Sequence, residues 1–171
     1  DKIESNRKIQ SLLEKLNCAE FAKVSSSESP TFRAFDDVVE RLKCKAISKN
    51  KISTTGQHPV WDQGAGGLLG YSDSVPTLDA SLKKPIILFG DHTCTMKLAI
   101  EPFHLGPNLI PFATKPTSDI DPIWLFYALI GKQKFQGYRR HWMELTQHSV
   151  IRVSKKIEDD FVLAVRPRLA L

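Results

Sequence analysis

The chain has 171 residues, of which 42% are hydrophobic and 25% charged, and its net charge is +5. These values predict a packed core in one domain, or in one domain with an appendage, and the positive excess is compatible with a polyanionic partner without requiring one. No apolar run approaches the ~20 residues that span a membrane, no signal peptide opens the chain, and three widely spaced cysteines indicate reduced thiols in a cytoplasmic protein.

The first 24 residues predict an α-helix. Ile9, Leu12, Leu13 and Leu16 recur every three or four residues, with charged residues between them. Such a stripe is typical of a surface helix packed on a core, and equally of an arm that pairs with another helix. The chain begins without methionine and with this pattern already under way, which is compatible with a fragment of a longer polypeptide.

Two features divide the chain. The serine-rich residues 25–30 have the composition of a linker, and the acidic residues 158–160 suit the first turn of a last helix, which Pro167 ends or kinks. The predicted order is therefore a helix (1–24), a linker (25–35), one domain (36–157) and the start of a further helix (158–171).

Short strands with long connections are predicted for the first part of that domain. Asp36 begins a short helical stretch, and after Ile47 glycine, proline and asparagine interrupt short apolar runs. Because proline cannot donate a ladder hydrogen bond, Pro111 predicts that the strand around it lies at a sheet edge. The strand candidates are residues 85–89, 95–100 and 109–112.

A well-delimited helix is predicted after Asp121. This aspartate can cap free backbone N–H groups, Pro122 suits the first helical position, and Gly131 suits the C-terminal end. Residues 149–153 then predict a late strand, so helices and strands are mixed in the same domain.

No familiar catalytic motif is present. The sequence has no Gly-x-Ser-x-Gly elbow, P-loop or Gly-x-Gly-x-x-Gly fingerprint. Asp91-His92 resembles part of a metal or acid–base site, but the other histidines lack ligand spacing, and an aspartate at a strand end more often binds backbone N–H groups. Cys94 lacks an orienting partner that would make it a nucleophile. We therefore expect no catalytic residue, no cofactor and no metal.

Residues 137–142, Gly-Tyr-Arg-Arg-His-Trp, combine cations with aromatic rings. Arginine can bond guanine or phosphate, and tyrosine and histidine can bond phosphate. The same segment also suits a helix N-terminus with solvated cations. We expect both, with Trp142 in the core and at least one of Arg139 and Arg140 facing a polyanion.

Four segments in this order resemble motifs of the specificity subunit of type I restriction–modification enzymes. Residues 55–64 with Gly70-Tyr71 are similar to Gly-x-x-Pro-Val-x-x-Gln-Gly, residues 87–93 to the family's most distinctive strand, residues 121–127 to Asp-Pro-x-Phe-x-Tyr-Tyr, and residues 137–142 to Gly-Tyr-x-Arg-His. The flanking segments resemble the family's long conserved helices.

The resemblance implies an α/β (α+β) target recognition domain with a twisted sheet and long loops, flanked by helices of a conserved coiled-coil spacer. Such a domain binds double-stranded DNA in the major groove and reads one half of a bipartite target. The helices dock methyltransferase subunits, a motor–nuclease subunit joins the complex, and the specificity subunit itself is not catalytic. This chain has room for one such domain, so it is a fragment or a half-length subunit whose helices could support a homodimer.

Two kinds of DNA contact are expected. Lysine and arginine neutralise phosphates, and side chains that bond base edges discriminate sequence, each good bidentate pair contributing ~1–3 kcal/mol. Gln63 is also expected to hold the scaffold, as are Gly64, Gly90 and Asp91. The residues expected at the DNA face are Gln63, Tyr71, His92, Thr93, Tyr138, Arg139, Arg140 and His141, with Lys51 and Lys97 at phosphates.

Two alternatives remain open at this point. One is a small metal-dependent hydrolase or nuclease that uses Asp91, His92 and His141. The other is a protein-interaction module in which the first helix and the helix around Phe161 bind a protein, so that the basic surface is incidental.

Overall fold

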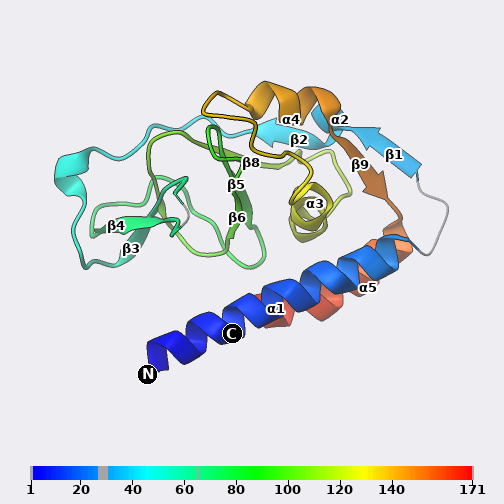
Figure 1. The fold of residues 1–171 in the computed structure, drawn as a ribbon, viewed down its shortest axis with the longest axis horizontal. Helices are drawn as coiled ribbons and strands as arrows, with labels where there is room; N and C mark the ends of the chain where they lie inside the picture. The colour runs from blue at the N-terminus through cyan, green and yellow to red at the C-terminus, as the bar shows by residue number, and fades with distance from the viewer. Residues whose placement is uncertain (1, 27–30, 65, 171) are drawn as a thin grey trace.

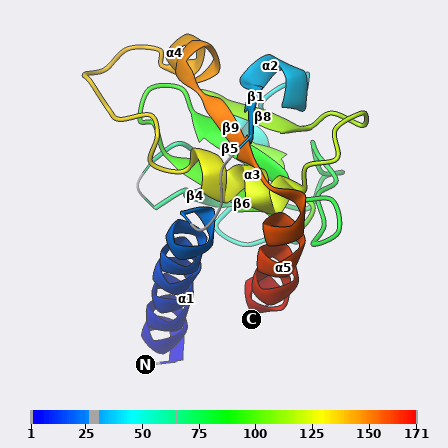
Figure 2. The same cartoon turned by 90° about the vertical axis from the view of Figure 1, so that its right-hand side faces the viewer.

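The computed structural model describes residues 2–26, 31–64 and 66–170. Two helices, α1 (Lys2–Ser25) and α5 (Lys155–Val165), lie together along one side, and the strands and shorter helices form a body on the other side (Figure 1, Figure 2). The first of them confirms the predicted N-terminal helix. Within the described part of the chain, none of the helices combines the length and apolarity needed to cross a bilayer.

Nine strands form three sheets in the described residues. The strands are β1 (Thr31–Ala34), β2 (Val39–Arg41), β3 (His58–Trp61), β4 (Leu68–Ser72), β5 (Ile86–Gly90), β6 (Met96–Ala99), β7 (His104–Leu105), β8 (Leu109–Thr114) and β9 (Val150–Val153). The central sheet is antiparallel, in the order β2-β8-β5-β6. Beside it lies the sheet β4-β3-β7, in which β3 and β7 are parallel, and β1 pairs with β9.

Strand β5 carries a core on each of its faces. Ile87 and Phe89 belong to a cluster that includes Trp124, whereas Leu88 belongs to a second cluster that includes Phe103. Alternate side chains of a strand point to opposite faces, so both faces of β5 are covered. This double burial explains why the strand is apolar throughout. The other helical elements are α2 (Phe35–Val38), η1 (Lys49–Lys51), α3 (Pro122–Leu129), α4 (Trp142–His148) and η2 (Arg166–Ala170).

Helix α3 confirms the local start and stop signals. Asp121 Oδ1 accepts a hydrogen bond from the backbone N–H of Ile123 at 2.8 Å, and Pro122 is the first helical residue. The helix ends before Gly131, which adopts a φ of +75° that an L side chain rarely takes. Seven of its eight residues are buried, so α3 forms the centre of the larger core.

The C-terminal half of α1 attaches the long helices to this core. The Phe21 ring packs against Trp124 and Phe161, with ring centroids 4.7 and 5.4 Å apart. Asn17 donates to the Tyr127 hydroxyl at 3.0 Å. Nearer its N-terminus α1 extends past these contacts (Figure 1), and an apolar stripe there stays 50–56% exposed. The members of this stripe are Ile9, Leu12 and Leu16.

The edge position predicted from Pro111 is wrong. Strand β8 lies between β2 and β5, with Pro111 opposite Leu88 of β5. On the other side, Leu42 donates its N–H to Pro111 O at 2.9 Å, but the proline has no N–H to return. The pairing of β2 with β8 ends at Arg41, one residue before Leu42. Proline is tolerated in a central strand here because its neighbour is short.

Three predicted boundaries also need correction. Residues 31–34 of the expected linker form β1, which pairs with β9 residue for residue, while residues 27–30 lie outside the described part. The helical stretch expected from Asp36 is the single turn α2, and Val39 already belongs to β2. The last helix starts at Lys155, three residues before 158, and its α-helical part ends at Val165, just ahead of Pro167.

Candidate nucleic-acid interface

The turn that joins β5 to β6 carries the Asp91-His92-Thr93 motif and is tied to the loop after β3. Thr93 Oγ1 and Thr95 Oγ1 each donate to the main-chain oxygen of Gln63, at 2.9 and 3.0 Å. Gln63 Oε1 accepts from the backbone N–H of His92 at 3.1 Å. Gln63 is only 8% exposed. The polar groups of Gln63 and Thr93 therefore shape the turn.

Asp91 joins this turn to helix α4. Its Oδ1 accepts from the backbone N–H groups of His141 and Trp142, at 3.1 and 2.9 Å, and its main-chain oxygen accepts from His141 N at 2.8 Å. A carboxylate at the start of a helix satisfies N–H groups that have no partner within the helix. The Asp91 side chain thus locks residues 50 positions apart in the sequence into one unit.

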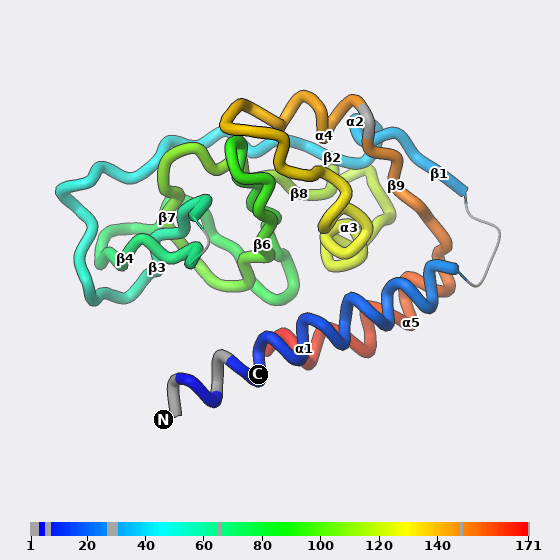
Figure 3. The backbone as a smooth tube through the Cα atoms, in the orientation of Figure 1, coloured from blue at the N-terminus to red at the C-terminus, as the bar shows by residue number. Residues whose placement is uncertain are grey.

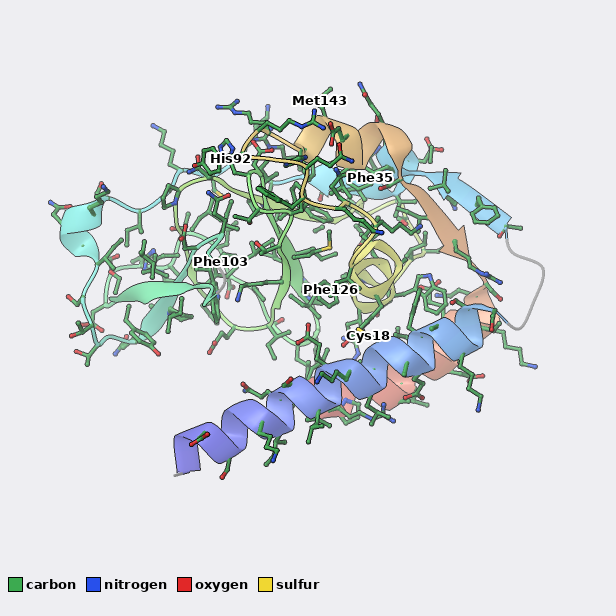
Figure 4. All side chains as sticks on the ribbon, viewed as in Figure 1. Cys18, Phe35, His92, Phe103, Phe126 and Met143 are labelled. Carbon is green, nitrogen blue, oxygen red and sulfur yellow. The ribbon has the colours of Figure 1, made fainter. Side chains whose placement is uncertain are left out.

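The ring of His92 projects from this unit and stacks on the ring of Tyr138. The two ring centroids are 4.7 Å apart and the planes differ by 12°, and His92 Nδ1 donates to Arg139 O at 3.1 Å. Tyr138 is 76% exposed. Figure 4 labels His92 in the upper part of the body, whereas Cys18 of α1 lies on the opposite side. The stacked rings therefore face away from the long helices.

Two arginines flank the stacked rings. The Arg140 side chain is 83% exposed, with Nε 3.8 Å from Asp91 Oδ2. Arg139 Nη2 contacts Glu144 Oε1 at 2.5 Å and donates to Gln136 at 2.9 Å. We call His92, Tyr138, Arg139 and Arg140 the aromatic–basic cluster. It combines a stacked pair of rings, of which Tyr138 is exposed and His92 half-buried, with two guanidinium groups that can each donate several hydrogen bonds.

Glu144 of α4 organises the loop that carries this cluster. Its Oε2 accepts from Gln133 Nε2 at 2.8 Å and contacts His141 Nδ1 at 3.1 Å. The hydrogen bond with His141, more than the charge of Arg139, holds the pKa of the Glu144 carboxyl below its ordinary value, against the effect of desolvation. No motif in the sequence includes Glu144. The one signal that could have indicated it is its position three residues after His141, on the same helix face.

His141 lies beneath the cluster. Its side chain is fully buried, with Nδ1 at Glu144 and Nε2 3.1 Å from Gly137 O. The ring therefore holds the loop to α4. Trp142, expected in the core, packs beside Phe35, Phe89 and Phe112 with ring centroids 5.4–6.0 Å apart.

The remaining expected residues lie on other elements. Tyr71, on β4 of the sheet β4-β3-β7, exchanges backbone hydrogen bonds with Ser53, which lies outside the named strands. Lys51 is exposed at the end of η1. Lys97 of β6 lies with Nζ 5.2 Å from the Trp61 ring centroid, and desolvation lowers its pKa. Lys97 lines a cleft of about 580 Å³ between β6, α3, η2 and α1, so the structure does not bring it together with the aromatic–basic cluster.

The geometry gives the hydrolase alternative no support. Asp91 uses its carboxylate on backbone N–H groups, His92 stacks on Tyr138, and both ring nitrogens of His141 have partners. Among the residues that the structure describes, no group of three or more histidine, cysteine, aspartate or glutamate side chains is arranged to hold a metal ion.

Solved structures provide the similarities to known proteins. No protein-family model matches the sequence, and no curated protein matches it either. The fold is similar to the type I restriction–modification S subunit from M. genitalium (TM-score 0.62, 15% identity, 84% of this chain and 39% of that one). It is also similar to the HsdS subunit from Thermoanaerobacter tengcongensis (0.54, 13%, 99% and 47%) and to a chain from a structure on complex assembly and conformational transition of the type I R-M system (0.57, 10%, 98% and 48%).

These similarities confirm the predicted fold class and the structural side of the resemblance. The chain spans less than half the length of each of these solved chains. Identities of 10–15% show a shared fold rather than a shared activity. The chain therefore has the mixed helix-and-sheet fold seen in these type I restriction–modification S subunits.

Proposed function

We propose that this chain is a DNA-recognition module of a type I restriction–modification specificity subunit, reading one half of a bipartite target without cleaving or modifying it. The observation that carries the proposal is the aromatic–basic cluster. Tyr138 is 76% exposed and the Arg140 side chain 83% exposed, yet Asp91 and His141 fix the backbone beneath them. Preorganised arginine and aromatic groups are suited to bond base edges and phosphates.

The proposed contact surface is narrower than the set expected from the sequence. His92, Tyr138, Arg139 and Arg140 contact DNA directly, and Lys51 contacts phosphate. Gln63, Thr93 and His141 hold the scaffold, because their polar groups are buried or already bonded. Tyr71 and Lys97 lie outside the proposed contact.

The long helices are proposed to make the protein contacts. The exposed stripe on α1 is suited to pair with an apolar helix face, either in a methyltransferase subunit or in a second copy of this chain. The motor–nuclease subunit would join through that complex in the cytoplasm. In this arrangement the partner subunits cleave and modify the DNA. This agrees with an interface in which Asp91 and His141 hold the scaffold.

Binding to duplexes selected from a randomised pool tests the proposal. Arg140→Ala should weaken the affinity for the selected duplex about tenfold at low salt, within the range of one lost bidentate contact. Lys156→Ala removes the same charge from an exposed position on α5 and should leave the affinity unchanged. The purified chain should leave labelled duplex intact in Mg²⁺ or Zn²⁺. Unchanged affinity in Arg140→Ala, or cleavage, would refute the proposal.

A further inference from the structure

We propose that residues 41–51 form a phosphate-binding strip, which holds DNA in register against the aromatic–basic cluster. The inference rests on the proposed function and adds a contact that does not depend on base sequence. The strip carries five exposed cations, and only Lys51 among them is expected at a phosphate from the sequence alone. They are Arg41, Lys43, Lys45, Lys49 and Lys51.

The first half of the strip alternates between core and solvent. Leu42 and Cys44 are half-buried and pack against the second core cluster, whereas Arg41, Lys43 and Lys45 are exposed. In an extended chain, side chains two positions apart repeat every ~6.6 Å on one face. This repeat is comparable to the spacing of successive phosphates along a DNA strand, so neighbouring cations can meet neighbouring phosphates.

The backbone of the strip is fastened to the body at its start and at its middle. Leu42 donates to Pro111 O at 2.9 Å and Ile47 donates to Leu105 O at 2.8 Å. The turn η1 is closed by Lys51 N donating to Ser48 O at 3.0 Å. DNA binding therefore does not have to order the segment, which removes one of the usual entropic costs of association.

The charge of the strip is not neutralised locally. Residues 41–51 contain five cations and no acid, while the whole chain has a net charge of +5. In the described part of the chain, the ion pairs involve none of the five cations. Fixed cations of one sign raise the local concentration of a polyanion and release its counterions on binding.

One end of the strip adjoins the aromatic–basic cluster. The Arg41 guanidinium lies 5.9 Å from the Trp142 ring centroid. Trp142 N donates to Asp91, whose other carboxylate oxygen lies 3.8 Å from Arg140. From there the strip crosses to η1 along the edge opposite α1 and α5 (Figure 3). A duplex lying along this edge can contact the cluster and the strip together.

The salt dependence of duplex binding separates this inference from the proposed function. In the full chain, Lys43→Gln/Lys45→Gln should reduce the magnitude of the slope of log affinity against log salt by about 2, since each phosphate contact contributes ~0.9. The loss should be the same for duplexes of unrelated sequence. The control Lys83→Gln/Lys84→Gln removes the same charge beside Leu82, whose carbonyl accepts from Arg166 near the long helices, and should keep the wild-type slope.

The outcomes are distinct. If wild-type binding is steeply salt-dependent and the strip variant matches the control, the strip is refuted and the proposed function stands. If the wild-type chain binds no duplex at any salt concentration, both are refuted. A reduced slope in the strip variant alone, with an unchanged thermal unfolding curve, supports the strip.

Discussion

At the scale of single residues, Gly90 shows how tightly the β5–β6 turn is built. A Cβ at this position would lie 2.4 Å from Thr93 Oγ1 and 2.6 Å from Thr95 Oγ1. Neither hydroxyl can easily move away, because both donate to the Gln63 main-chain oxygen. The glycine is therefore required by close approach, and the turn that presents His92 depends on it.

Gly90→Ala should lower the free energy of unfolding by about 1–3 kcal/mol, the usual cost of overpacking a filled site. The matched control is Gly66→Ala, where a Cβ would meet nothing within 4 Å, so its effect should stay within about 0.5 kcal/mol. Urea unfolding of both variants measures the difference. Equal stabilities would mean that the turn relaxes and that this packing does not position His92.

At the scale of elements, local sequence signals were sufficient to predict α3 but insufficient to predict how the candidate interface is assembled. Asp121 and Gly131 act on their own neighbours, so their effects are visible in the sequence. The role of Pro111 depended on where the partner strand β2 ends, which its own neighbours do not determine. Likewise, residues 87–93 and 137–142 are separate motifs in the sequence, whereas the Asp91 carboxylate joins them across 50 positions. Such long-range hydrogen bonds leave no periodic pattern.

Glu158 makes a further long-range joint, between α5 and the start of α3. Its side chain is fully buried, and Oε1 accepts from Asp121 N at 2.6 Å. Its Oε2 has no hydrogen-bond partner among the described residues. Desolvation raises the pKa of this carboxyl despite the hydrogen bond and the nearby Lys155. Protonation relieves the cost of burying the charge, so the joint is most stable with a neutral acid.

The pH dependence of stability follows from the upward shift of the Glu158 pKa. A carboxyl with a raised folded-state pKa contributes stability that is complete below its unfolded pKa and lost as the pH rises through the folded value. Glu158→Gln keeps an oxygen acceptor for Asp121 N and removes the charge. The variant should therefore gain stability relative to wild type as the pH rises from 4 to 8, in urea unfolding. Asp159→Asn, exposed on the same helix, should show no such gain, and parallel curves for wild type and Glu158→Gln would contradict the assignment.

At the scale of the whole molecule, two kinds of surface lie on opposite sides. The aromatic–basic cluster and the strip occupy one edge of the body, and α1 and α5 occupy the other (Figure 1). The core around α3 connects them, because Trp124 contacts Phe21 of α1 and donates its Nε1–H to Arg152 O of β9 at 2.8 Å. Under the proposed function, DNA and a protein partner would bind at the same time without competing for the same residues.

This separation predicts that the two functions can be lost independently. If a second copy of this chain covers the exposed stripe of α1, Leu12→Glu/Leu16→Glu should weaken self-association at least tenfold, since each buried leucine contributes about 1.5–3 kcal/mol. Its affinity for a duplex carrying a single half-site should equal that of wild type. Tyr138→Ala should weaken the affinity for the half-site duplex and leave self-association unchanged.

Sedimentation equilibrium and half-site binding measure the two properties on the same samples. Ser11→Glu/Ala22→Glu adds the same charge at exposed α1 positions on another face of the helix and should leave both properties unchanged. Because the half-site duplex engages one chain at a time, a fall in its affinity in Leu12→Glu/Leu16→Glu could not come from lost bivalency. Such a fall would show that α1 contributes to the DNA interface, so that the two surfaces are not separate.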